Sequence, residues 1–161
     1  MKLERREFFI TLARRLSLLA FPGLLASFLE SCSSSNNPVS ASSGTSSLTT
    51  INGTYQNGVV SIPIGSSSPL AASGGAVQIK SSKGYLLADR QSNNSFNAMS
   101  AICTHQGCLI GLFDSSKNQF VCGCHGSRFS ATGSVVQGPA GSALPTYKTS
   151  FANNQLDIQV G

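Results

Sequence analysis

The sequence predicts an all-β, antiparallel domain. Charged residues make up only 11% of the chain, tryptophan is absent, and 16 glycines are scattered along it. Short apolar runs alternate with turns rich in glycine, asparagine and serine, which is typical of strands rather than long helices. The 161 residues suffice for one modest domain with extensions. The formal net charge of +5 forms no clustered basic stripe, so a nucleic-acid-binding function has no support.

The first 32 residues are typical of an export signal. A basic start precedes an apolar stretch from Leu16 to Leu29, interrupted by Pro22-Gly23. This stretch is shorter than the about 20 residues that a membrane-spanning helix needs, and it suits the apolar part of a signal peptide. Arg5-Arg6-Glu7-Phe8-Phe9 resembles a twin-arginine signal, which directs export of folded, cofactor-loaded proteins. An ordinary basic signal and an uncleaved anchor helix are the alternatives.

Cys32 ends that segment and is expected to carry a lipid anchor. Leu29-Glu30-Ser31-Cys32 resembles a bacterial lipobox, with Glu30 as a departure, and a lone thiol in a membrane helix is the alternative. Residues 33–50 are rich in serine, asparagine and threonine and nearly uncharged, which predicts a flexible tether. The folded domain, residues 51–161, would then lie on the periplasmic side of a bacterial membrane.

From residue 51 onward the sequence predicts short strands. Pro63 favours the edge of a sheet because proline cannot donate to a strand ladder. Ser81-Ser82-Lys83-Gly84 and Asn153-Asn154 are expected to be hairpin turns. The predicted strands are residues 59–64, 76–80, 85–88, 96–102, 109–113, 119–121, 147–151 and 155–160.

Two short boxes hold four of the five cysteines and both histidines of the chain. Each box offers one cysteine and one histidine at ligand spacing, Cys103-x-His105 and Cys122-x-x-His125. Thiolate and imidazole ligands on paired loops indicate zinc or an iron–sulfur cluster. A four-ligand zinc site leaves the other two cysteines unexplained, and a plain disulfide framework leaves both histidines unexplained. The boxes are Cys103-Thr104-His105-Gln106-Gly107-Cys108 and Cys122-Gly123-Cys124-His125-Gly126-Ser127-Arg128-Phe129.

These boxes resemble those of Rieske iron–sulfur proteins, specifically the branch found in cytochrome bc-type quinol-oxidising complexes. The resemblance implies one [2Fe-2S] cluster per chain, with one iron held by two cysteines and the other by two histidines. It also implies a disulfide between two further cysteines, which ferredoxin-type Rieske proteins lack. The fold implied is an antiparallel β-sandwich with a small cluster-binding subdomain at about residues 100–135. The implied ligands are Cys103, Cys122, His105 and His125, and the implied disulfide joins Cys108 to Cys124.

The resemblance gives roles to residues around the cluster as well. Ser127, which follows Gly126, is expected to hydrogen-bond a cluster sulfide, and Gly138-Pro139-Ala140 is expected to form a loop over the cluster. Phe129 occupies the position of a tyrosine that raises the reduction potential of high-potential relatives. Gln106 replaces an apolar residue that is usual at the quinone-docking surface.

The ligand chemistry predicts one-electron transfer. Two neutral imidazoles in place of two thiolates make a cluster less negative and therefore easier to reduce. The resemblance implies that a quinol donates the electrons and that cytochrome b and a c-type cytochrome are the partners, with no complete active site on this chain alone. A subunit of a periplasmic oxidoreductase similar to arsenite oxidase, or a lipid-tethered shuttle, is the alternative. A ring-hydroxylating oxygenase is excluded, because only His105 and His125 exist and its iron site needs two further histidines.

Overall fold

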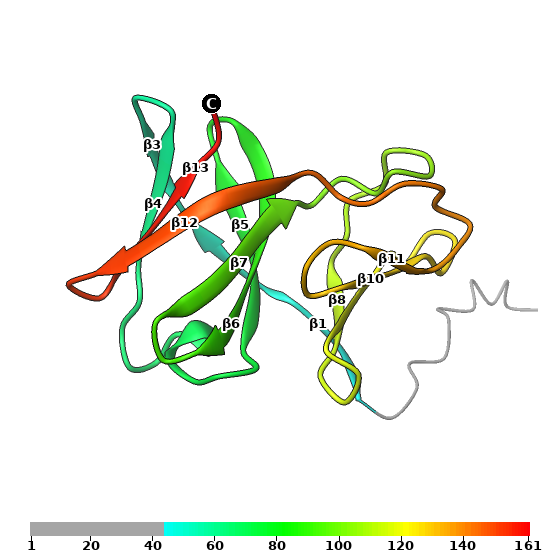
Figure 1. Cartoon of the computed structure of the whole chain (residues 1–161), viewed down its shortest axis with the longest axis horizontal. Coiled ribbons are helices and arrows are strands. Elements are labelled where there is room, and N and C mark those ends of the chain that lie inside the picture. Colours follow the sequence, from blue (N-terminus) through cyan, green and yellow to red (C-terminus); the bar gives the residue numbers. More distant parts are fainter. Residues whose placement is uncertain (1–43) are drawn as a thin grey trace, which may run out of the picture. The chain divides into compact units, whose positions relative to one another are not determined.

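A computed structural model describes residues 44–161, and these residues form two β-sheets (Figure 1). Within this range the one helical element is the 3-10 turn η1 (Pro69–Ala71), so no described helix is long and apolar enough to cross a membrane. The strands are β1 (Thr45–Ser47), β2 (Thr49–Asn52), β3 (Thr54–Gln56), β4 (Val59–Pro63), β5 (Ala76–Ser81), β6 (Gly84–Ser92), β7 (Ser95–Ser100), β8 (Leu112–Asp114), β9 (Gln119–Val121), β10 (Arg128–Ser130), β11 (Val135–Gln137), β12 (Thr146–Ala152) and β13 (Gln155–Gln159).

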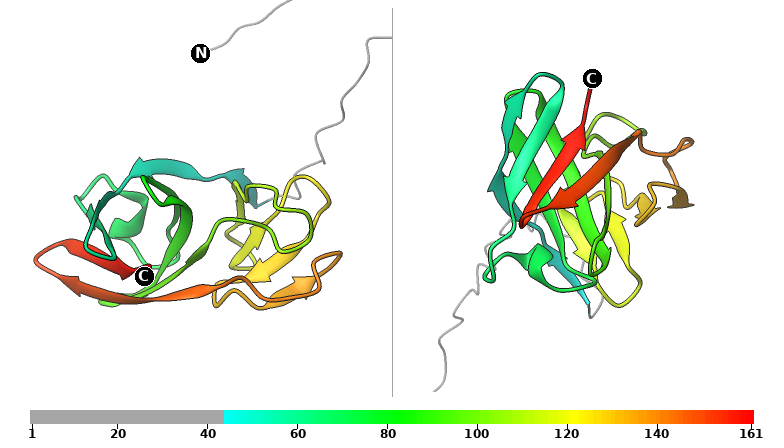
Figure 2. Two further views of the ribbon diagram at one scale, coloured as in Figure 1. Left: turned by 90° about the horizontal axis from the view of Figure 1, so that it is seen from above. Right: turned by 60° about the vertical axis from the view of Figure 1, so that its left-hand side comes forward.

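The larger sheet has eight strands in the order β2-β5-β6-β7-β12-β13-β4-β3. Its two end strands, β2 and β3, are separated in the chain by Gly53 alone, so the sheet curls until its ends meet (Figure 2). A β-carbon on Gly53 would lie 2.6 Å from Val60 Cγ1 and 2.9 Å from Ile79 Cγ2. Only glycine allows the backbone to approach these core residues so closely. The pairs in this sheet are antiparallel except for β2 with β5.

The smaller sheet positions both cysteine/histidine boxes. It has five strands in the order β1-β8-β9-β10-β11, all antiparallel where they pair. The first box lies in the connection from β7 to β8, and the second lies in the connection from β9 to β10. Because β8 and β9 pair directly, the two connections leave the sheet side by side.

The core has two parts that share strands β6 and β7. Leu86 and Ala88 pack into the core of the larger sheet, whereas Leu87 between them packs with the residues around the boxes. Successive side chains of a strand point to opposite faces, so β6 is buried on both of its faces. Phe96 and Met99 of β7 divide between the two cores in the same way. This shared sheet fixes the box-bearing loops to the rest of the domain.

The antiparallel all-β prediction is confirmed, including both hairpins. Asn153 and Asn154 both have positive φ, 52° and 57°, as a tight two-residue hairpin turn requires. The expectation for Pro63 is wrong for the strand as a whole, since β4 lies between β13 and β3. Pro63 itself pairs with Gln155 of β13 but extends past the end of β3, so its missing amide costs no ladder bond.

The folded region begins earlier than the sequence predicts. Strands β1 and β2 lie at residues 45–52, inside or across the end of the stretch expected to be a tether. Apart from Ile51, their residues are polar and mostly exposed, so no alternating apolar pattern marks these strands. Cys32, the export signal and the remainder of the predicted tether lie outside the described residues.

Candidate metal centre

The two boxes are built on the same backbone pattern. In each loop the carbonyl of the first cysteine accepts a hydrogen bond of 2.9 Å from the glycine amide four residues later. The amide of that cysteine donates to the carbonyl five residues on, at 2.8 Å in the first loop and 2.9 Å in the second. The glycines have φ of +74° and +78°, a conformation that any side chain would strain. The residues are Cys103, Gly107 and Cys108 in the first loop and Cys122, Gly126 and Ser127 in the second.

Two free, buried thiols lie at the base of these loops. Cys103 is 2% exposed and Cys122 is fully buried, and both belong to one apolar cluster. Burial raises the pKa of the Cys122 thiol, and the side chain of Cys103 beside it raises that pKa further. The backbone amides of Cys124 and His125 donate toward the Cys122 sulfur and act in the opposite direction. Two adjacent thiols held away from water, with amides aimed at one of them, suit thiolate ligation of a metal.

The two histidine rings of the boxes face each other. The rings of His105 and His125 lie 4.8 Å apart between centroids and nearly perpendicular, at 88°. Among the described residues, Nδ1 of His105 is one of two buried side-chain polar atoms without a hydrogen-bond partner. A buried imidazole nitrogen without a partner is costly unless it binds something else. The His125 side chain is exposed. These two rings and the two buried thiols therefore fit a mixed thiolate–imidazole metal centre.

A disulfide joins the tips of the loops. Cys108 bonds to Cys124 across a sequence separation of 16 residues, with their Cα atoms 6.6 Å apart. The sulfurs of Cys108, Cys122 and Cys124 all lie within 4.8 Å of one another. Two of these three sulfurs are bonded to each other and offer no thiolate, so they form a clamp beside the centre rather than a ligand set of their own.

A third loop closes over the boxes. It contains the cis peptide Gly138-Pro139, and Ala140 is buried while Pro139 is exposed. The amide of Ala140 donates to Oγ of Ser127 at 3.0 Å, and the hydroxyl of Thr104 donates to the carbonyl of Ser142 at 2.6 Å. One bond therefore ties the third loop to each box.

Phe129 and Gln106 differ in their surroundings. Phe129 is fully buried in the apolar cluster that contains both free cysteines, and it pairs with Phe120 on β9. Gln106 is exposed at the tip of the first box, between His105 and Gly107. A buried aromatic in the same apolar cluster as the thiols can change the environment of the centre, whereas the exposed Gln106 side chain is available to a partner molecule.

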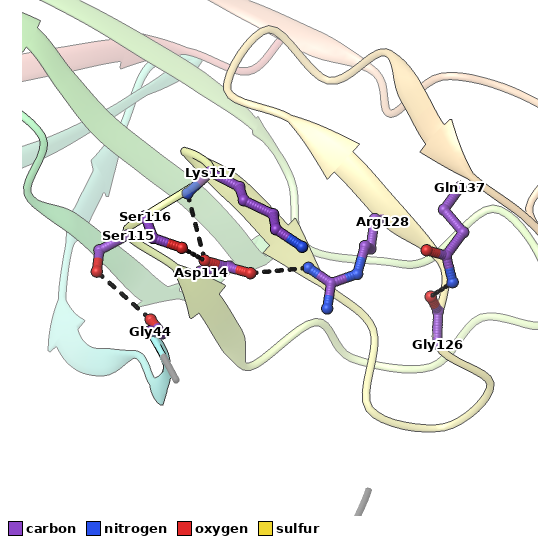
Figure 3. A network of polar contacts seen from close by, with 8 residues as sticks. All are labelled: Gly44, Asp114, Ser115, Ser116, Lys117, Gly126, Arg128 and Gln137. Atoms are coloured by element: carbon purple, nitrogen blue, oxygen red, sulfur yellow. Dashed lines mark hydrogen bonds and ion pairs between the residues drawn. The ribbon is translucent and has the colours of Figure 1, made fainter. Parts of the chain in front are cut away.

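Arg128 of the second box forms an ion pair with Asp114 of β8. No sequence motif marks this pair, and the sequence did not predict it. Arg128 Nη1 lies 3.0 Å from Oδ2 of Asp114, whose side chain is fully buried, while the Arg128 side chain is 18% exposed. The hydroxyl of Ser116 donates to Oδ1 of Asp114 at 2.6 Å, and the Lys117 amide reaches the same oxygen at 3.3 Å (Figure 3). Hydrogen bonding from Ser116, followed by the contact with Arg128, lowers the pKa of Asp114 against the opposing effect of burial. Nearby Gln137 donates to the Gly126 carbonyl at 3.3 Å.

A buried glutamine supports the first box from the larger sheet. Gln78 of β5 is 6% exposed and donates to the carbonyl of Ile110, two residues after the box ends, at 2.9 Å. The hydroxyl of Thr50 on β2 donates to the other end of the Gln78 amide at 3.0 Å. No sequence pattern predicts this supporting role for Gln78, because its two hydrogen-bond partners lie 28 and 32 residues away in the chain.

The sequence of this chain is similar to that of known proteins. A family profile described as the Rieske [2Fe-2S] domain matches residues 61–148. The cytochrome b6-f complex iron-sulfur subunit of Synechococcus sp. (strain WH7803) is 36% identical over 80 residues, which are 50% of this chain and 44% of that protein. The subunit of the same name from Chlorobaculum thiosulfatiphilum is 38% identical over 64 residues, or 40% of this chain and 35% of that protein. The chain thus spans less than half the length of these relatives.

Solved structures of Rieske proteins resemble this chain as well. The crystal structure of the cyanobacterial plasma membrane Rieske protein PetC3 from Synechocystis PCC 6803 is 33% identical, with a TM-score of 0.51, and the match covers 60% of this chain and 97% of that one. Naphthalene 1,2-dioxygenase also has a TM-score of 0.51 but is 18% identical, and 26% of that chain is covered. The second likeness shows the fold alone.

Proposed function

The chain belongs to the Rieske [2Fe-2S] family, whose cofactor is a [2Fe-2S] cluster, and from this premise we propose that it is a one-electron carrier of a cytochrome bc-type complex. Cys103 and Cys122 would hold one iron, and His105 and His125 would hold the other. The observation that supports the proposal is the presence, on two paired loops, of two buried free thiols and two facing imidazoles, one of which has an unpartnered buried nitrogen.

The bound cluster would supply one-electron transfer at a potential above that of all-cysteine clusters. The chain supports this chemistry by shielding the cysteine side and exposing the histidine side. Cys103 and Cys122 are closed off from water, whereas the His125 ring is exposed and His105 is half-buried. An electron would therefore leave or arrive most directly on the histidine side of the centre.

The histidines can also hold protons. With one ring nitrogen bound to iron, the other nitrogen of His105 and of His125 remains able to bind or release a proton. The bound cluster would therefore be able to couple the gain of an electron to the uptake of a proton at these nitrogens. Oxidation of a quinol releases both. We therefore infer a quinol as the donor, with cytochrome b and a c-type cytochrome as partners, a choice supported by the relatives named as cytochrome b6-f iron-sulfur subunits.

The proposal extends to the part of the chain before the described residues. Residues 1–32 act as an export signal, Cys32 is acylated, and a tether keeps the domain at the periplasmic side of a membrane. One acyl chain binds a bilayer only marginally, so stable anchoring needs at least two. Mass spectrometry of the mature protein tests this: an unmodified peptide running through Phe28 to Asn37 would exclude the lipid anchor.

The cluster itself is tested on protein made with working cluster assembly. Two irons and two sulfides per chain are expected, and the reduced protein should give an electron paramagnetic resonance signal of low average g. His105→Cys should shift that signal, because it changes one ligand, whereas the matched surface change Gln159→Ala should leave it unaltered. Stoichiometric zinc without iron in the wild-type protein would overturn the assignment. Reduction by a quinol analogue, followed by oxidation by a c-type cytochrome, then tests the donor and acceptor.

A further inference from the structure

We propose that the Asp114–Arg128 ion pair sets the reduction potential of the centre through two opposed charges, and this inference rests on the proposed function. Between Ile102 and Tyr147 the chain has only three formally charged side chains apart from histidine. They are Asp114, Lys117 and Arg128. Within this stretch, which contains both boxes and the loop over them, any electrostatic effect of charged side chains on the centre must therefore arise from these three.

The pair is close to the second box along the backbone. Arg128 directly follows Ser127 and lies three residues after His125. It pairs with Val121, the residue before Cys122, on β9 and with Gln137 on β11. Asp114 reaches Arg128 from β8, on the far side of β9. Arg128 therefore belongs to the second box itself, whereas Asp114 lies two strands away in the same sheet.

The surroundings let both charges act over a distance. Asp114 is fully buried and Arg128 is mostly buried, so water screens the pair less than it screens an exposed charge. Lys117 provides the contrast, because its side chain is exposed on the turn between β8 and β9. Three donors, from Arg128, Ser116 and the Lys117 amide, hold the Asp114 carboxylate ionised in one place.

The expected effects of the two charges have opposite signs. Reduction adds a negative charge to the centre, so a fixed positive charge favours the reduced form and a fixed negative charge opposes it. Removing Arg128 should lower the reduction potential, and removing Asp114 should raise it. A purely structural role predicts something else, because breaking the pair from either side would then disturb the same loop in the same way.

The test uses the full-length, cluster-loaded chain as wild type, Asp114→Asn, Arg128→Gln and the double variant. Midpoint potentials are measured by protein-film voltammetry at pH 7, and electron paramagnetic resonance checks that the ligands are unchanged. Each single substitution should change the equilibrium constant for reduction about three- to tenfold, or about 30–60 mV, in opposite directions. The double variant should return toward wild type. Single variants that shift in the same direction, or not at all, would overturn the inference.

Two controls make the result specific. Lys117→Gln removes one positive charge from the neighbouring turn, and its shift should be much smaller than that of Arg128→Gln. An equal shift would mean that net charge, and not the buried pair, is responsible. Arg128→Lys retains the charge, so its potential should stay near wild type, which separates charge from loss of folding. If the wild-type protein holds no iron, the proposed function fails. If it holds the cluster but the potentials of Asp114→Asn and Arg128→Gln do not shift in opposite directions, only this inference fails.

Discussion

The Ser127 hydroxyl oxygen accepts a hydrogen bond of 3.0 Å from the backbone amide of Ala140, and both residues are buried. Because the amide already occupies one acceptor position of this oxygen, the hydroxyl hydrogen is free to donate in another direction. Ser127 belongs to the second box, and Ala140 belongs to the loop that closes over the boxes. A single contact thus joins this loop to the residue expected to donate to a cluster sulfide.

Replacing Ser127 by alanine should lower the reduction potential and weaken the fold. Loss of one donor to the centre is worth about 1 kcal/mol between redox states, or about 45 mV. The Ala140 amide would also be left buried without a partner, which costs about 1–3 kcal/mol of unfolding free energy. Voltammetry and thermal unfolding measure the two effects. Ser134→Ala, at an exposed serine, should change neither, and an unaltered potential in Ser127→Ala would contradict the assigned role.

Replacing Cys108 by serine should destabilise the loops without changing the ligands. Opening a disulfide that spans 16 residues is expected to cost about 3 kcal/mol. The electron paramagnetic resonance signal should keep its g values, while cluster loss on heating should become faster. Since Cys108 and Cys124 act as one unit, the double serine variant should lose no more stability than the single one. Complete loss of the cluster in Cys108→Ser, with two free thiols at these positions in the wild type, would show that they are ligands instead.

Replacing Phe129 by tyrosine should raise the reduction potential. Phe129 is fully buried in the apolar cluster that includes Cys103 and Cys122, and we expect a hydroxyl added to its ring to donate to a ligand sulfur. A hydrogen bond to a charged group contributes roughly 1.5–3 kcal/mol, of which about 1–1.5 kcal/mol should distinguish the redox states. The corresponding rise is about 40–65 mV by voltammetry near neutral pH.

Phe113→Tyr is the matched control, since Phe113 lies on β8 in the same apolar cluster of side chains, beyond Phe120. It should leave the potential unchanged. A potential that stays constant or falls in a folded Phe129→Tyr protein would show that the Phe129 ring edge does not face the centre.

Asp89 should make stability depend on pH between about 4 and 6. Burial raises the pKa of its carboxyl to about 6, although hydrogen bonds from Gln91 and Asn97 act against this rise. The folded protein then binds a proton more tightly than the unfolded chain, whose aspartate pKa is about 3.9. Its unfolding free energy is therefore higher below this range and falls as the pH rises through it, by at most about 3 kcal/mol.

Asp89→Asn should remove that part of the pH dependence, as measured by denaturant unfolding at pH 4.5 and pH 7. Asp157→Asn serves as the control, because the Asp157 carboxylate accepts its bond from Gln155 at the surface. The control should keep the wild-type difference between the two pH values. If Asp89→Asn also keeps the wild-type difference in stability between the two pH values, a group other than Asp89 is responsible for it.

The sequence alone determined the fold class and the candidate ligands, because both depend on local patterns. Alternation and turn residues such as Asn153-Asn154 act over a few positions, and they specified the hairpins closely. The candidate ligands can be recognised in the sequence because a metal centre needs particular atoms on short loops. Their types and spacing are Cys103-x-His105 and Cys122-x-x-His125. The glycines four residues after each first cysteine were a further local signal for the matching turns.

Only the tertiary structure decided what surrounds those ligands. Strands β1 and β2 form because β8 and β5 offer them partners, and their own residues, polar except for Ile51, show no alternating pattern. Asp114 meets Arg128 across an intervening strand, and Gln78 supports the first box from the other sheet. Each of these contacts joins residues 14 or more positions apart, so its strength comes from burial and geometry that a linear pattern does not carry.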